Sequence, residues 1–166
     1  MTLVAAIAQE NPSPTSSGQA TNVGGPNNLT QAVVKAGALS CAARVEQVTG
    51  SLGFGPNVGA SVMVPAQPFD QRMFALQMEV AAGAASNSLV NMTFAPQQAN
   101  GCGASYEAIS YWTQSCDALA RGSFAQLKRV KAMQKDVLLL DGGPALRVFL
   151  MQAGTGCVSI KKEIVL

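Results

Sequence analysis

Residues 102–166 decide the fold, and they read CGASYEAISYWTQSCDALARGSFAQLKRVKAMQKDVLLLDGGPALRVFLMQAGTGCVSIKKEIVL. Short apolar runs alternate here with turn residues, and Asp141-Gly142-Gly143 is a strong signal for a tight turn between two strands. A second turn is predicted at Gly154-Thr155-Gly156, before a closing strand. Thr113 can cap a short helix over Gln114–Arg121. The stretch therefore predicts antiparallel strands with one short helix inserted before the last of them.

Upstream of this stretch, the sequence predicts a helix and a hairpin. Apolar residues recur every three or four positions from Leu29 to Val48, which predicts one long helix that begins at Asn28 and stops at Gly50. Residues 72–81 and 88–94 alternate apolar and polar side chains, as paired strands do. The fold class is therefore α+β: a sheet of about five to seven consecutive, hairpin-connected strands, with the long N-terminal helix packed on it.

The chain divides into three segments by composition. Residues 1–8 are apolar and end in Ala6-Ile7-Ala8, which fits a signal-peptidase site; we interpret them as a signal-peptide remnant, with an ordinary apolar N-terminal segment as the alternative. Residues 9–28 are rich in Pro, Ser, Gly and Asn and predict a flexible tether. Residues 29–166 form a single domain.

The four cysteines predict two disulfides. Their number is even and no Cys-x-x-Cys pair occurs, so disulfides are favoured over zinc, although buried free thiols are the alternative. Three pairings are open to four cysteines; we favour Cys102–Cys116 with Cys41–Cys157. Disulfides and the export-like start together predict an extracytoplasmic protein, periplasmic or secreted.

The amino-acid composition limits the kinds of partner that the chain is expected to bind. Charged residues make up only 12% of the chain and the net charge is +2, which is too small to predict binding to nucleic acid. No apolar run approaches the ~20 residues that a transmembrane helix needs, so no membrane span is expected. A local basic run at Lys128, Arg129, Lys131 and Lys135 is interpreted as a solvated surface, with an acidic partner as the alternative.

The sequence contains no histidine, which removes the commonest catalytic systems. Ser-His-Asp and Cys-His chemistry and His-ligated metal sites are excluded. Glu79 and Glu107 lie on neighbouring predicted strands, where a carboxylate pair could serve a hydrolase if the two lay about 5–9 Å apart in a cleft. We expect solvent-facing side chains instead, and predict no catalytic residue, no metal and no cofactor.

Aromatic and methionine residues supply the candidate binding surfaces. Tyr106, Tyr111 and Trp112 form the densest aromatic group and are the predicted interaction surface, with core packing as the alternative for Trp112. Four methionines lie on or near predicted strands and suit either the core or an adaptable apolar surface: Met63, Met73, Met78 and Met92.

These observations predict a non-enzymatic secreted or periplasmic domain that binds another protein as an inhibitor, an accessory or an assembly component. Two alternatives remain. One is a carrier that holds a small apolar ligand in a Met-lined gap between helix and sheet, and the other is a hydrolase that uses carboxylates.

Overall fold

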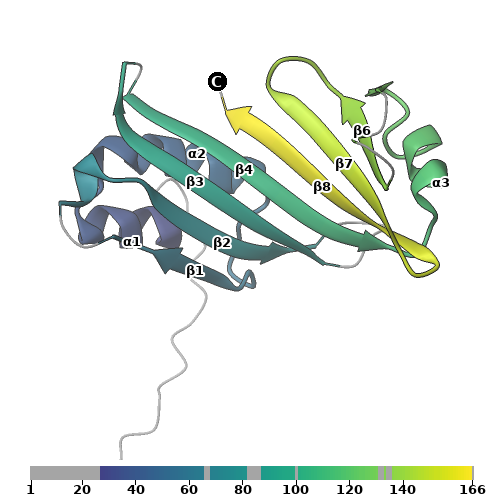
Figure 1. Cartoon of the computed structure of the whole chain (residues 1–166). Coiled ribbons are helices and arrows are strands. Elements are labelled where there is room, and N and C mark those ends of the chain that lie inside the picture. Colours follow the sequence, from purple (N-terminus) through teal and green to yellow (C-terminus); the bar gives the residue numbers. More distant parts are fainter. Residues whose placement is uncertain are drawn as a thin grey trace, which may run out of the picture.

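The computed structural model describes residues 27–65, 68–81, 87–99, 101–130, 133 and 136–165 of the chain. Within them, eight strands form one antiparallel sheet, so the α+β class is confirmed, whereas the expected five to seven strands were too few (Figure 1). The predicted signal-peptide remnant and nearly all of the tether lie outside the described residues. The elements are α1 (Asn28–Ala36), the 3-10 turn η1 (Leu39–Cys41), α2 (Ala42–Ser51), β1 (Ala60–Met63), the 3-10 turn η2 (Phe69–Gln71), β2 (Phe74–Val80), β3 (Ser88–Gln98), β4 (Gly101–Trp112), α3 (Cys116–Arg121), β5 (Lys128–Arg129), β6 (Val137–Asp141), β7 (Leu146–Ala153) and β8 (Gly156–Val165).

The predicted long helix is two helices. Asn27 caps α1 by accepting a hydrogen bond from the backbone N–H of Thr30, so the folded part begins within the predicted tether. Gly37 ends α1 in a left-handed conformation, with φ of 103°, which an L side chain rarely adopts. Phe69 of η2 packs at this break, 3.7 Å from where a Cβ on Gly37 would lie. The apolar periodicity continues across the break because α1 and α2 bury their faces in the same core.

The strand order is β1-β2-β3-β4-β8-β7-β6-β5, which corrects the expectation that consecutive hairpins suffice. The hairpins β2–β3 and β6–β7 are confirmed, the second closed by Asp141-Gly142-Gly143, where the Asp141 carboxylate accepts a hydrogen bond from the N–H of Gly143. From the end of β4, however, the chain passes through α3 to the far edge at β5. It then returns strand by strand, so that β8 pairs with β4 over nine residue pairs. The two halves of the sheet, β1–β4 and β5–β8, therefore join along the β4–β8 seam.

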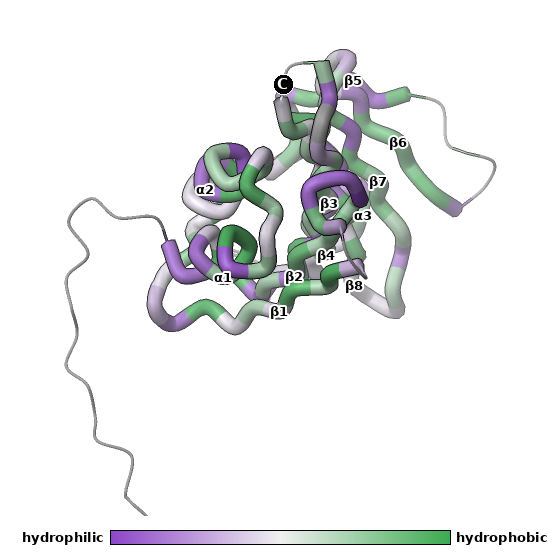
Figure 2. Tube along the Cα trace, turned by 90° about the vertical axis from the view of Figure 1, so that its left-hand side faces the viewer, coloured by the Kyte–Doolittle hydropathy of each residue, from purple (hydrophilic) through white to green (hydrophobic). Residues whose placement is uncertain are grey.

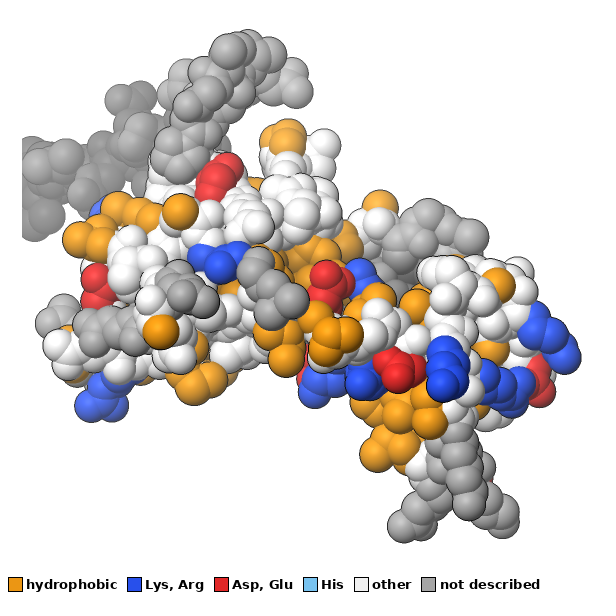
Figure 3. Space-filling model, turned by 90° about the horizontal axis from the view of Figure 1, so that it is seen from above, with side chains coloured by type: hydrophobic (Ala, Val, Ile, Leu, Met, Phe, Trp, Pro, Cys, Tyr) orange, Lys and Arg blue, Asp and Glu red, His pale blue; other side chains and the backbone are white. Residues whose placement is uncertain are grey.

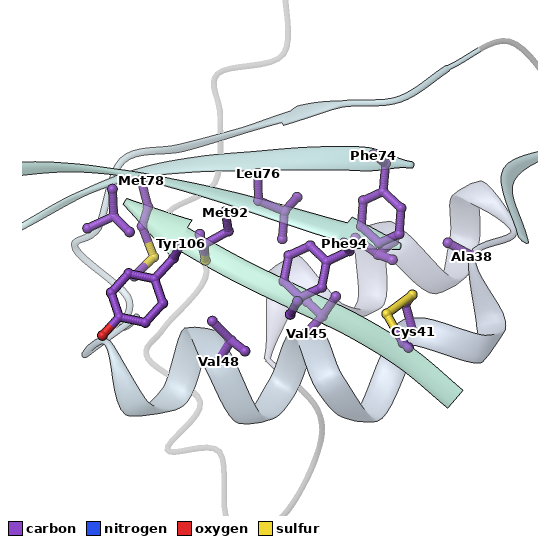
Figure 4. Close-up of a cluster of buried hydrophobic side chains, with 14 residues drawn as sticks. Ala38, Cys41, Val45, Val48, Phe74, Leu76, Met78, Met92, Phe94 and Tyr106 are labelled. Carbon is purple, nitrogen blue, oxygen red and sulfur yellow. A yellow bond between two sulfur atoms is a disulfide. The ribbon is translucent and has the colours of Figure 1, made fainter. Parts of the chain in front are cut away.

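Two hydrophobic cores lie on the same face of the sheet. The first fills the layer between α1–α2 and β2–β4, where Val45 and Val48 face Leu76 and Phe94 (Figure 4). The second lies under α3, where Leu119 packs against Leu140, Val148 and Leu150. Both cores use the even-numbered residues of β4, from Cys102 at one end to Trp112 at the other. Figure 2 shows α1 and α2 together on one side of the sheet.

Two disulfides are present, and the favoured pairing was wrong. The bonds are Cys41–Cys102 and Cys116–Cys157, with Cα atoms 5.0 Å and 5.1 Å apart. Cys102 lies on the helix-facing side of β4 under η1, so it meets Cys41 and not Cys116. Cys157 is the cross-strand neighbour of Trp112, the last residue of β4, and α3 begins just beyond it. Each disulfide thus fastens one helical layer to the sheet.

Candidate functional site on the open face of the sheet

The two faces of the sheet differ in what covers them. In β4, Cys102, Ala104 and Tyr106 are buried under the helices, whereas Glu107 and Tyr111 point to the opposite side. Within the part of the chain that the structure describes, no helix packs on that opposite side, which we call the open face (Figures 1 and 2). A side chain on the open face is therefore available to solvent or to a partner.

Apolar side chains occupy two adjacent cross-strand rows of the open face, which together we call the apolar patch. Leu89, Tyr111 and Met151 are 49%, 41% and 36% exposed, and the remaining members are half-buried by their neighbours. The patch crosses β3, β4, β8, β7 and β6. Its first row is Leu89, Ile109, Ile160, Phe149 and Leu139, and its second is Tyr111, Val158, Met151 and Val137.

The apolar patch breaks the usual pattern of a sheet with one solvated face. Such strands alternate apolar and polar residues, whereas strands covered on both faces are apolar at successive positions. The sequences VLLL at 137–140 in β6 and VFLM at 148–151 in β7 are of the second kind. Their even-numbered residues fill the core under α3, and their odd-numbered residues therefore lie on the open face. This run of successive apolar residues is the sequence signal from which the patch could have been found.

A row of polar side chains borders the patch and crosses the whole sheet; we call it the polar row. Lys162 pairs with Glu107, Arg147 pairs with Asp141 at 2.7 Å, and the Ser61 hydroxyl donates to Gln77 at 2.8 Å. Figure 3 shows positive and negative side chains in close succession on the half that carries β6 and β7, beside hydrophobic ones. In strand order the row is Ser61, Gln77, Asn91, Glu107, Lys162, Arg147, Asp141 and Lys128.

A hollow of about 530 Å³ opens where the polar row meets the end of β8. Its wall joins apolar groups, among them Phe149 and Ile164, to the ion-paired Glu107 and Arg147. Ile164 is 55% exposed. An apolar centre beside a polar, charge-balanced margin is the composition of protein–protein interfaces.

The structure does not bring the three predicted aromatic residues together on one surface. Tyr106 is 7% exposed and belongs to the core under α1–α2. Trp112 packs on the core under α3, stacks edge-on against Phe124, and donates its indole N–H to the Ser159 hydroxyl at 2.8 Å. Only Tyr111 lies on the open face, within the apolar patch. Alternation along β4 determines this, because Tyr106 and Trp112 share one parity and Tyr111 has the other.

Tyr106 is part of a hydrogen-bonded triad at the β4–β8 seam. Its hydroxyl donates to Glu163 at 2.5 Å and accepts from Lys161 at 2.6 Å, and Lys161 pairs with Glu163 at 2.9 Å. Burial raises the pKa of Tyr106, and the hydrogen bond to Glu163 adds to that. Burial acts against both charged forms, but the hydrogen bonds outweigh it: the pKa of Lys161 is raised and that of Glu163 is lowered. The triad therefore holds one cation, one anion and a neutral phenol at neutral pH.

The remaining residues singled out in the sequence are two carboxylates, four methionines and a basic run. None of them belongs to the apolar patch, and the two carboxylates are too far apart to act as a pair in one cleft. Glu79 and Glu107 are separated by β3 and offset by one row, roughly 12 Å on strand spacings, and each has its own partner, Asn87 and Lys162. Met78 and Met92 are fully buried in the helix–sheet layer, whereas Met63 and Met73 are each 63% exposed outside the patch. Of the basic run, Lys128 and Arg129 are described, and Arg129 pairs with Asp117 at 3.0 Å.

The described residues show neither a metal-binding cluster nor a helix that could span a membrane. No group of three or more His, Cys, Asp or Glu side chains there is arranged to hold a metal ion. None of the described helices is long and apolar enough to cross a membrane.

Comparison with known proteins gives no relative for this chain. No protein-family model, no curated protein and no solved structure matches it. Any functional proposal therefore rests on the geometry of the open face.

Proposed function

We propose that this protein is a non-enzymatic domain, secreted or periplasmic, whose open face binds another protein. The observation that carries the proposal is the apolar patch: nine apolar side chains from five adjacent strands, without a covering layer among the described residues. A contiguous apolar patch with a polar rim is a feature that marks interaction sites.

The borders of the patch support a protein partner over a small apolar ligand. Small-molecule sites are concave and bury most of the ligand, whereas the patch is the surface of a sheet. The helix–sheet layer, where a carrier would hold its ligand, is filled by Leu76, Met78, Met92 and Phe94, each at most 1% exposed. The polar row supplies the solvated margin that surrounds the apolar centre of an interface.

The two disulfides support an extracytoplasmic location, since such bonds persist where the environment is oxidising. The low charged fraction supports a partner as well. Only 12% of the residues in the chain are charged, so few charged groups are present to keep a protein with an exposed apolar patch in solution. A partner that covers the patch would remove this tendency to aggregate.

Quantitative affinity capture from the native extracytoplasmic fraction tests the proposal. Leu89→Glu and Met151→Glu place a carboxylate inside the patch at exposed positions. Met63→Glu, on the edge strand of the same face, is the matched control. We expect the wild type and Met63→Glu to capture equal amounts of the same partner. The two patch variants should capture at least about tenfold less of it, because a buried unpaired charge opposes binding. Equal recovery by all four proteins would contradict the proposal.

A further inference from the structure

The arrangement of side chains on the open face indicates what kind of partner would fit it. The apolar patch and the polar row are arranged nearly symmetrically about β8. In the first apolar row, Ile160 of β8 is flanked by Ile109 and Phe149, and these by Leu89 and Leu139. A surface that matches its own reflection across a central strand is suited to an isologous contact, in which two copies use the same patch.

We propose that the occupant of the open face is a second copy of this chain, packed sheet on sheet about a two-fold axis that runs along β8. The inference rests on the proposed function, because it names the partner for the same surface. Two such sheets lie about 10 Å apart, with their strands within about 30° of parallel. The pair would form a sandwich with the helices of both copies on the outside.

The two-fold axis places apolar side chains on apolar side chains. Since it exchanges β4 with β7 and β3 with β6, Ile109 meets Phe149 of the second copy, and Leu89 meets Leu139 of the second copy. Ile160 and Val158, both on β8, meet their own equivalents. Tyr111 meets Met151 of the second copy. Every member of the first apolar row thus has an apolar partner.

The same axis makes the charges of the polar row complementary. Glu107 of one copy lies opposite Arg147 of the second copy, and the reverse contact occurs on the other side of the axis. Lys162 lies nearest its own equivalent, but each Lys162 is already paired with Glu107, is 52% exposed and can extend into solvent. Electrostatic matching of this kind fixes the register of an interface and disfavours other partners.

The flat area of the surface corresponds to an interface at the small end of the known range. Five strands and three rows cover roughly 24 Å by 20 Å. That flat area is more than half of the about 800 Å² that each partner contributes to a standard interface, before the relief of the side chains is included. The hollow at the end of β8 adjoins this rectangle and adds to the surface that a second copy can reach.

Sedimentation equilibrium on the full chain, with two charge reversals, tests the axis. We expect the wild type to sediment at twice 17.1 kDa. In a pair of Arg147→Glu chains, each new carboxylate meets Glu107 of the second copy. In a pair of Glu107→Arg chains, each new guanidinium meets Arg147. Each variant alone should show a dimer dissociation constant raised at least about tenfold.

An equimolar mixture of the two variants should recover the dimer, because both cross-copy contacts then join opposite charges. The intrachain changes are the same in the mixture as in the separate variants, so recovery reports only on the contact between copies. Met63→Glu, outside the patch, should dimerise like the wild type, and circular dichroism checks that every variant is folded.

Three results would overturn the inference. They are a wild type that stays monomeric up to about 100 μM, a mixture no better than the separate variants, or a dimer that Met63→Glu weakens as much as the patch reversals do. A monomer that still captures a different protein in a patch-dependent manner would refute the second copy and leave the proposed function standing. A monomer whose capture ignores the patch variants would refute both.

Discussion

The hydroxyl of Tyr106 lies between an ammonium group and a carboxylate, at the seam where the two halves of the sheet join. Lys161 also approaches the face of the Tyr106 ring, 5.2 Å from its centroid. A hydroxyl that both donates and accepts fixes the neighbouring side chains in one arrangement. The triad thus gives the hydroxyl of Tyr106 both a donor and an acceptor, so the burial of this tyrosine leaves its polar group paired.

The triad predicts a pH dependence of stability. The carboxylate of Glu163 has a lowered pKa in the folded state, so its contribution is complete above the unfolded pKa and is lost as pH falls through the folded one. Glu163→Gln should therefore lower the free energy of unfolding at pH 7 by about 1 kcal/mol, with the half-exposed position taken into account. The difference from wild type should shrink towards about pH 3.

Urea denaturation at several pH values measures this. Asp117→Asn is the matched control, since its ion pair with Arg129 is exposed, lies outside the open face and should contribute no more than about 0.5 kcal/mol. A Glu163→Gln deficit that stays constant from pH 7 to about pH 3 would contradict the assigned role of the carboxylate.

At the scale of elements, the break between α1 and α2 is determined by one glycine. Gly37→Ala forces a Cβ into a left-handed conformation and should destabilise the domain by about 1 kcal/mol. Gly50→Ala is the matched control, because Gly50 is helical, exposed, and has nothing within 4 Å of its added Cβ. It should stabilise the domain by up to about 1 kcal/mol. Thermal unfolding of both variants measures the difference, and shifts of the same sign would contradict this description of the break.

Local signals in the sequence predicted the elements well. The short helix α3, the two hairpins and the turn residues between β6 and β7 follow from residues within a few positions of one another, although Ser115 caps α3 and not the predicted Thr113. The break between α1 and α2 could not be predicted from local signals, because the apolar periodicity continues through Gly37. Phe69, which packs at the break, is distant from Gly37 in the sequence.

Contacts between distant elements could not be predicted in the same way. Cys116 and Cys157 meet because β8 pairs with β4, an arrangement that depends on the return of the chain through β5, β6 and β7. Nothing in the spacing of the cysteines encodes that return. The same long-range pairing aligns the apolar rows of the open face, so the rows could not be predicted, although the apolar runs of β6 and β7 were present in the sequence.

At the scale of the whole molecule, one face of the sheet holds both cores and both disulfides, and the other holds the patch. The disulfides close loops of 61 and 41 residues, and each should stabilise the fold by about 4 kcal/mol in the chain-entropy description. A fold fastened in this way can keep an apolar face exposed without losing its structure. Stability thus resides on the helical side, and recognition is proposed for the open side.

Oxidation of native methionines tests whether the open face is covered, without any mutation. Met151 lies in the patch and is 36% exposed, whereas Met63 and Met73 are 63% exposed and lie outside it. Since methionine oxidation follows exposure, the three should react within about twofold of one another if the face is bare. In the native assembled protein, we expect Met151 to oxidise at least about tenfold more slowly than Met63 and Met73, and Leu89→Glu to abolish that protection. Oxidation of Met151 at the rate set by its 36% exposure would contradict a covered patch, and with it the binding role of the open face.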